Sequence, residues 1–168
     1  LLYRTEYPSW LYPVTQGATT IWERWDGQKP DGTFQNPGMN SFNRYAYGAV
    51  GDWLYRKVAG IDLKPGHPGF KSFVIKPHPG GEMNDVKATY ASPYGTIMSK
   101  WKIEDGKIHL KVKIPVNTEA DIYVPSSGDE LIVNGEAVSA AEVDESTKGL
   151  RFLKITRGSG EYVLVADY

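Results

Sequence analysis

The residues best suited to chemistry lie close together near the start of the sequence. Glu23 stands between Trp22 and Trp25 and directly before Arg24, within the stretch 17–27. Indole rings stack on the apolar C–H face of a pyranose, charged groups bind sugar hydroxyls, and a positioned carboxylate acts as a general base on water. These residue types at this spacing indicate a site that holds and cleaves a sugar.

The same residues also fit a purely structural role. Thr20 and Glu23 have the spacing of a capping box, in which a hydroxyl and a carboxylate satisfy each other's backbone N–H groups at a helix start. The pattern then predicts a short helix that begins after Thr20 and ends at Asp26-Gly27. Capping boxes are far commoner than catalytic glutamates, so on these residues alone the capping role is the favoured interpretation.

The other polar residues indicate no second site. His67, His78 and His109 lack metal-ligand spacing, the sequence has no cysteine, and it contains no nucleophile motif or phosphate-binding loop. We therefore expect neither a metal nor a cofactor. Asp31 precedes a glycine and is expected in a turn, while Asp52 is expected on a helix surface.

Composition limits the partners. The 168 residues carry a formal net charge of -1 and no block of Lys and Arg, which argues against nucleic acid or an anionic membrane as a partner. No apolar run approaches the roughly 20 residues that span a bilayer, and no signal-peptide pattern is present. The compartment stays undetermined. The sequence begins Leu1-Leu2-Tyr3-Arg4, which we interpret as a truncation point.

A change in composition predicts two domains, residues 1–62 and 63–168. The first is rich in tryptophan and interrupted by prolines, and its clearest helix runs from Asn40 or Ser41 to Val58, with Gly60 just after its end. Apolar residues cover much of that helix, so it needs neighbours on more than one side. We expect it to be the edge of a larger helical domain, covered by upstream sequence or by a second copy.

The second domain has strand-like patterns throughout. Asp105-Gly106 is typical of a two-residue type I′ turn and predicts a hairpin over 96–114, with Trp101 opposite Leu110 and Ile103 opposite Ile108. Lysines occupy the other face, which we interpret as solvated. Short strands at this spacing predict an antiparallel β-sandwich, with further strands or hairpins at 70–75, 85–90, 120–124, 130–138, and 150–156 paired with 161–166.

Four motifs, in order, resemble the C-terminal portion of bacterial α-L-rhamnosidases, and the resemblance covers nearly the whole chain. They are Glu6-Tyr7-Pro8-Ser9-Trp10, the stretch from Gly17 to Trp25, Met39-Asn40-Ser41-Phe42-Asn43 with the following Tyr45 to Gly51, and Pro68-Gly69-Phe70 through Ile75-Lys76-Pro77. The resemblance implies the closing helices of an (α/α)₆ barrel followed by a β-sandwich. It also implies an inverting glycoside hydrolase that acts on a rhamnose-containing glycoside.

Within that family the general base corresponds to Glu23, so the resemblance reverses the preference for a helix cap. Trp22 and Trp25, with Tyr7 or Trp10, then become candidates to line the rhamnose pocket. The family's general acid lies upstream of this sequence. An inverting site needs two carboxyl groups roughly 6.5–9.5 Å apart, so this chain alone is expected to be inactive.

One position departs from the family pattern. Arg44 stands where the family has a histidine close to the sugar, and an arginine can neither accept a hydrogen bond nor lose its proton. Arg44 is therefore a candidate substrate-binding residue that cannot copy a contact made by neutral imidazole. Two alternatives remain open: an (α/α)₆ glycosidase for another sugar, and a non-catalytic carbohydrate-binding or structural module in which Glu23 caps a helix.

Overall fold

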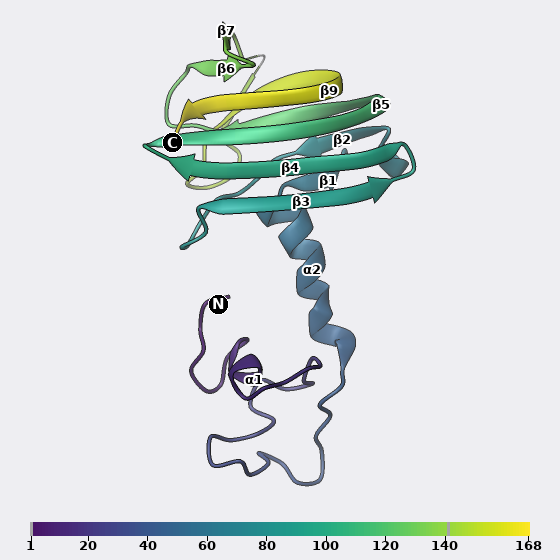
Figure 1. Cartoon of the computed structure of the whole chain (residues 1–168), viewed down its shortest axis with the longest axis vertical. Coiled ribbons are helices and arrows are strands. Elements are labelled where there is room, and N and C mark those ends of the chain that lie inside the picture. The colour runs from purple at the N-terminus through teal and green to yellow at the C-terminus, as the bar shows by residue number, and fades with distance from the viewer. Residues whose placement is uncertain (1, 141) are drawn as a thin grey trace. The chain divides into compact units, whose positions relative to one another are not determined.

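The computed structural model describes residues 2–140 and 142–168 of the chain. The backbone forms two compact units, Leu1–Gly51 and Asp52–Tyr168, which are described separately (Figure 1). In chain order the elements are α1 (Tyr12–Thr15), a 3₁₀-helix (Tyr45–Ala49), α2 (Val50–Trp53), a π-helical turn (Leu54–Val58), β1 (Ile61–Leu63), a second 3₁₀-helix (Pro68–Phe70), β2 (Ser72–Ile75), β3 (Asp85–Ser92), β4 (Gly95–Glu104), β5 (Lys107–Pro125), β6 (Leu131–Val133), β7 (Glu136–Val138), β8 (Glu142–Asp144) and β9 (Phe152–Asp167).

The N-terminal unit is organised by aromatic rings more than by regular secondary structure. α1 forms a single turn, and most of the unit lies in turns and loops. Trp22 is buried and meets the edge of Phe42 at a ring-centroid distance of 4.9 Å and that of Tyr12 at 6.4 Å. Edge-to-face contacts of this kind are the geometry that aromatic quadrupoles favour. The helices of an (α/α)₆ barrel are not shown by this unit, so that expectation rests on the resemblance.

The predicted long helix begins later than its sequence suggested. The residues proposed as its cap, Asn40 and Ser41, lie in irregular backbone, and helical turns begin at Tyr45. The reason is that Arg44 has an extended backbone (φ -131°, ψ 113°) and donates its N–H to Ile21 O at 2.7 Å. The helical end agrees with the prediction: turns stop at Val58, and Gly60 follows with a φ of +82° that favours glycine.

The helical turns expose apolar side chains, as their pattern suggested. Tyr45 is 90% exposed and Trp53 is 46% exposed. Within the described residues, no helix is long and apolar enough to cross a bilayer.

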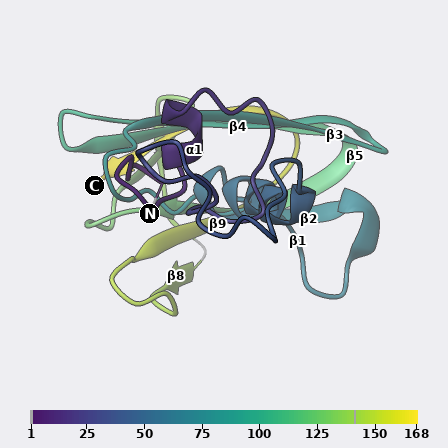
Figure 2. The ribbon, with the colours of Figure 1, turned by 90° about the horizontal axis from the view of Figure 1, so that it is seen from below.

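The C-terminal unit is a two-layered β-structure, and its two longest strands pass through both layers (Figure 2). Residues 107–114 of β5 pair with β4 and with residues 160–167 of β9. After an irregularity between Ile114 and Glu119, the rest of β5 pairs with β2 and with the first half of β9. Each long strand therefore bends from one layer into the other, and the side chains between the layers form one core.

This arrangement corrects three expectations. The strand predicted at 120–124 is the second half of β5, and the pair predicted at 150–156 and 161–166 is one strand, β9. Both predicted pieces of β9 pair with β5, so the glycines between them allow a bend and not a reversal. The sandwich is also not wholly antiparallel, because β2 runs parallel to β5.

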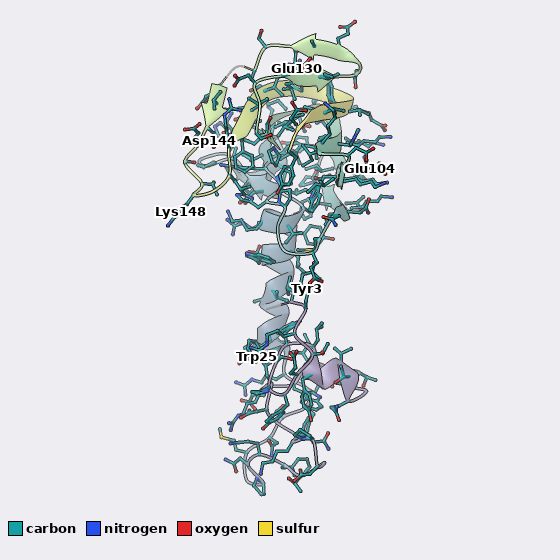
Figure 3. The ribbon with its side chains drawn as sticks, turned by 90° about the vertical axis from the view of Figure 1, so that its left-hand side faces the viewer. Tyr3, Trp25, Glu104, Glu130, Asp144 and Lys148 are labelled. Carbon is teal, nitrogen blue, oxygen red and sulfur yellow. The ribbon has the colours of Figure 1, made fainter. Side chains whose placement is uncertain are left out.

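The hairpins agree with their prediction. Trp101 lies opposite Leu110 and Ile103 opposite Ile108, with Asp105 and Gly106 both at positive φ in the turn. The lysines of the other face are exposed, and charged side chains such as Glu104 project into solvent (Figure 3). The hairpin at 130–138 forms as β6 and β7. Side chains buried between the layers include Phe73, Ile75, Ile97, Trp101, Ile108, Leu110, Val112, Ile122, Val124, Leu153 and Leu164.

Polar contacts attach the end of the helical turns to the β-structure. Trp101 Nε1 donates to Val58 O at 2.8 Å, and Ser99 Oγ donates to Ala59 O at 2.6 Å. Both side chains are fully buried, so these bonds satisfy backbone carbonyls where water cannot reach them.

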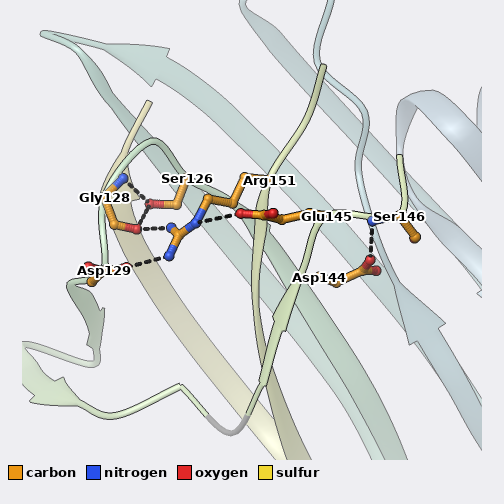
Figure 4. A network of polar contacts seen from close by, with 7 residues as sticks. All are labelled: Ser126, Gly128, Asp129, Asp144, Glu145, Ser146 and Arg151. Atoms are coloured by element: carbon orange, nitrogen blue, oxygen red, sulfur yellow. Dashed lines mark hydrogen bonds and ion pairs between the residues drawn. The ribbon is translucent and has the colours of Figure 1, made fainter. Parts of the chain in front are cut away.

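A second polar network joins loops at the edge of β9. The guanidinium of Arg151 bonds Gly128 O and the carboxylate of Asp129, and its Nε lies 3.7 Å from Glu145 (Figure 4). Asp144, at the end of β8, accepts the N–H of Ser146 at 2.8 Å in the same region. These contacts hold the loop before β6 against the connection between β8 and β9.

Candidate functional site

Two segments about twenty residues apart in sequence are bonded together around Glu23. The Glu23 N–H donates to Ser41 O at 2.9 Å, and the Arg44 N–H donates to Ile21 O at 2.7 Å. The Thr20 hydroxyl bonds Phe42 O. The segments 20–23 and 41–44 therefore run alongside each other, and this contact places the side chains of both.

The capping-box interpretation is wrong. Residues 20–26 form no helix, because the Thr20 hydroxyl and the Glu23 N–H both bond carbonyls of the facing segment. The expected helix end at Asp26-Gly27 is instead a turn, in which the Gly27 N–H donates to Arg24 O at 3.2 Å. Glu23 is thus free of the role that competed with a catalytic one.

The Glu23 carboxylate is paired with Arg44. Arg44 Nη1 lies 2.7 Å from Glu23 Oε1, and the Glu23 side chain is 25% exposed. A half-buried carboxylate with water access has the placement that a general base needs. The structure thus joins the candidate base to the residue that departs from the family pattern, a contact that sequence spacing did not reveal.

Three aromatic rings form a cluster beside this segment. Trp25 lies against Tyr47 at 5.6 Å with a tilt of 36°, and Trp10 meets Trp25 at 6.0 Å and Tyr47 at 5.9 Å, both edge-on. Trp25 is among the side chains labelled in Figure 3. Its indole Nε1 is buried and has no bonding partner within the described residues. An indole N–H in this position is an unused hydrogen-bond donor.

A cavity of about 240 Å³ opens next to the cluster. It contains three of the five residues predicted to bind substrate, Trp10, Trp22 and Trp25. The other lining residues are Pro13, Val14, Ala18, Thr19, Thr20, Ile21 and Tyr47. Glu23 is not among the lining residues, although it adjoins Trp22 in sequence. The cavity is therefore mostly apolar, with two threonine hydroxyls near it.

Tyr7 and Arg44 lie apart from the cavity lining. The Tyr7 ring packs edge-on against Tyr12 at 5.0 Å, and its hydroxyl reaches Asp26 O at 3.4 Å. Burial raises the pKa of the Tyr12 hydroxyl. Tyr7 thus contributes to the packing beneath the site in this structure.

Three other charged residues that the sequence analysis considered, Arg24, Asp31 and Asp52, have structural partners. Arg24 forms two bonds with Asp26, from Nε at 3.1 Å and from Nη2 at 3.2 Å. Asp31 accepts the N–H and the hydroxyl of Thr33, and the hydroxyl bond is the main cause that lowers the pKa of this carboxyl, so the predicted turn role is confirmed. Asp52 is exposed and pairs with an arginine four residues later.

Sequence reasoning missed Tyr47 as a member of the aromatic cluster. The residue belongs to the quoted motif Tyr45-Ala46-Tyr47, but nothing local indicates that it lies against Trp25, 22 residues earlier. Within residues 2–140 and 142–168, no group of three His, Asp or Glu side chains could hold a metal ion.

Comparisons with known proteins match both parts of the chain to one family. Residues 1–58 match the bacterial alpha-L-rhamnosidase 6 hairpin glycosidase domain, and residues 60–139 match the bacterial alpha-L-rhamnosidase C-terminal domain. An alpha-L-rhamnosidase of Streptomyces avermitilis is 48% identical over 126 residues, which cover 75% of this chain and 12% of the relative. An alpha-L-rhamnosidase of Formosa agariphila is 39% identical over 170 residues, which cover 100% of this chain and 18% of the relative.

Solved structures show the same similarity. The structure of Streptomyces avermitilis alpha-L-rhamnosidase complexed with L-rhamnose superposes with a TM-score of 0.81 and 38% identity, covering 98% of this chain and 15% of that one. The structure of alpha-L-rhamnosidase from Dictyoglumus thermophilum gives a TM-score of 0.81 with 28% identity, and the match covers 97% of this chain and 18% of that one. The chain thus spans less than a fifth of the length of these relatives. By sequence and by structure alike, the chain belongs to the bacterial α-L-rhamnosidase family of glycoside hydrolases.

Proposed function

We propose that this chain supplies the general base of an inverting α-L-rhamnosidase, and that Glu23 is that base. The proposal rests on the environment of the Glu23 side chain. Its carboxylate is partly exposed, is paired with Arg44 and does not cap a helix. It adjoins a segment that lines an aromatic cavity. A water-accessible carboxylate is one of the two that an inverting glycosidase needs, and an apolar surface of this size suits a sugar ring.

In this reaction Glu23 accepts one proton. A water molecule attacks the anomeric carbon of a terminal α-L-rhamnosyl unit and passes its proton to the carboxylate. The bond to the leaving oxygen breaks on the opposite face, and that oxygen receives a proton from a general acid elsewhere in the whole protein. The anomeric configuration is thereby inverted.

The aromatic cavity would receive the sugar. The 6-deoxy sugar has an apolar face and a methyl group, both of which suit stacking against Trp25 and Trp22. The two cavity threonines, Thr19 and Thr20, offer hydroxyl groups that can bond the hydroxyls of the sugar ring. Tyr7 would support the pocket indirectly, through its edge-on contact with Tyr12.

The exposed aromatic residues on the helical turns need a cover in the complete protein. We propose that the rest of a six-hairpin domain, or a second copy of the chain, packs on Tyr45 and Trp53. The division into a catalytic part at 1–62 and a β-sandwich at 63–168 remains our proposal. The boundary between the two compact units falls after Gly51 in the sequence.

A second function, carbohydrate binding without catalysis, is favoured by one observation: the cavity is lined by tryptophans but not by Glu23. In that case the aromatic rings would hold a sugar, and Glu23 would only connect two loops through Arg44.

Replacing Glu23 by Gln in the full-length protein distinguishes the two functions. On an aryl α-L-rhamnoside we expect a loss of about 10²-fold or more in kcat, because the amide cannot accept the proton of water. The matched control is Glu82→Gln, the same chemical change on an exposed loop residue. Unaltered turnover of a folded Glu23→Gln protein, with binding of L-rhamnose retained, would leave only the binding function. A panel of other aryl glycosides tests the sugar specificity.

A further inference from the structure

We infer that Arg44 is a positioning residue for Glu23: it holds one oxygen of the carboxylate so that the other faces the attacking water. This inference rests on the proposed function of Glu23. It replaces the sequence-based expectation that Arg44 binds the substrate directly.

The backbone sets the pair in place before any ligand arrives. Glu23 and Arg44 lie on the two segments that are bonded through Glu23 N–H to Ser41 O and through Arg44 N–H to Ile21 O. Arg44 has an extended backbone and directly precedes the helical turns that begin at Tyr45. These backbone bonds set the distance between the two residues before a substrate binds, and such a preset geometry favours catalysis.

The ion pair uses one carboxylate oxygen. Arg44 Nη1 bonds Oε1 at 2.7 Å, and within the part of the chain that the structure describes no protein donor bonds Oε2. A carboxylate acting as a base needs such an oxygen for the proton of water. The single contact therefore orients the carboxylate without blocking it.

A second arginine–carboxylate pair nearby shows the contrast. Arg24 engages both oxygens of Asp26, with Nε on Oδ1 and Nη2 on Oδ2. A two-point pair of this kind fixes a carboxylate and occupies it. Asp26 and Glu23 are both partly exposed, so exposure does not separate them. The two carboxylates differ in how many of their oxygens an arginine engages, and this difference favours Glu23 as the base.

The pair contributes little to folding. The Arg44 side chain is 56% exposed, and exposed ion pairs are worth about 0–1 kcal/mol because water and salt screen them. Removing the guanidinium should therefore alter the orientation of Glu23 and leave the fold in place. A residue that only supported the structure would affect thermal unfolding first.

A double-mutant cycle in the full-length protein tests the inference. We expect Arg44→Met to lower kcat on an aryl α-L-rhamnoside about tenfold with little change in KM, since a misplaced catalytic group costs rate more than binding. Arg44→Lys should recover part of the loss because the charge returns. In the Glu23→Gln protein, Arg44→Met should cause no further loss, because a residue that acts only through Glu23 has nothing left to position. Arg157→Met is the matched control, since within the described residues the Arg157 side chain bonds only the carbonyl of its neighbour, Thr156.

Four results would overturn the inference. A rise in KM with unchanged kcat would make Arg44 a direct substrate contact. Additive losses in the double variant would show that Arg44 acts independently of Glu23. A loss with Glu23→Gln but none with either Arg44 variant would refute this inference alone, whereas unaltered turnover of Glu23→Gln would refute the proposed function as well. If Arg44→Met does not fold, Arg44→Lys and its double variant provide the same comparison.

Discussion

The ion pair between Lys76 and Asp144 gives a stability prediction that can be worked from the structure. Lys76 Nζ lies 2.7 Å from Asp144 Oδ2 and also 4.6 Å from the centre of the Phe152 ring. The bond from Lys76, with a second bond from Ser146, lowers the pKa of the Asp144 carboxyl from 3.8 to about 2. The ionised carboxylate is therefore more favourable in the folded than in the unfolded chain, and it stabilises the fold.

The size and the pH dependence follow from this shift. A pKa difference of this size corresponds to at most about 2 kcal/mol at neutral pH, and the Asp144 side chain is only 15% exposed, so solvent screening is limited. Because the folded pKa is the lower one, the contribution is complete above the unfolded value and is lost as the pH falls from about 4 to about 2. Near pH 3 about half of it should remain.

Urea unfolding of the chain, followed by far-UV circular dichroism, measures this contribution. We expect Asp144→Asn to lower the free energy of unfolding by about 1–2 kcal/mol at pH 7, with a gap to the native chain that narrows by pH 3. The control Glu145→Gln removes an exposed neighbouring charge and should change stability by less than about 0.5 kcal/mol. A gap of equal size at both pH values, or no gap at pH 7, would refute the assigned role of the pair.

Two further substitutions test the attachment of the helical turns to the β-structure. Gly60→Ala should destabilise the chain by about 3 kcal/mol or more, because an added Cβ would lie 2.2 Å from Pro77 N and the φ of +82° is strained for alanine. Thermal unfolding measures this loss of stability. A native-like melting temperature would contradict the close packing around Gly60. Trp101→Phe should cost about 2–4 kcal/mol, because it leaves Val58 O buried without its donor and opens a void in the core. Urea denaturation checks this cost, and a cost below about 1 kcal/mol would mean that water replaces the indole.

Local sequence patterns were sufficient for much of the β-structure. Alternation of apolar and polar residues predicted the register of the 96–114 hairpin, because side chains on a strand alternate between faces and Asp105-Gly106 fits a tight turn. The same patterns could not show that β5 and β9 each pass through both layers. Whether a glycine-containing break reverses the chain or only bends it depends on which strand pairs across it, and that partner is distant in sequence.

The candidate site divides in the same way. The sequence alone determined that aromatic rings and a carboxylate gather near residues 22–25, and the resemblance identified their family. Only the tertiary structure decided that Glu23 caps no helix and is held by Arg44, 21 residues later. A capping box and a cross-loop pair need the same local residue types. What separates them is whether the backbone N–H groups bond within the segment or to a facing one, and only long-range packing settles that choice.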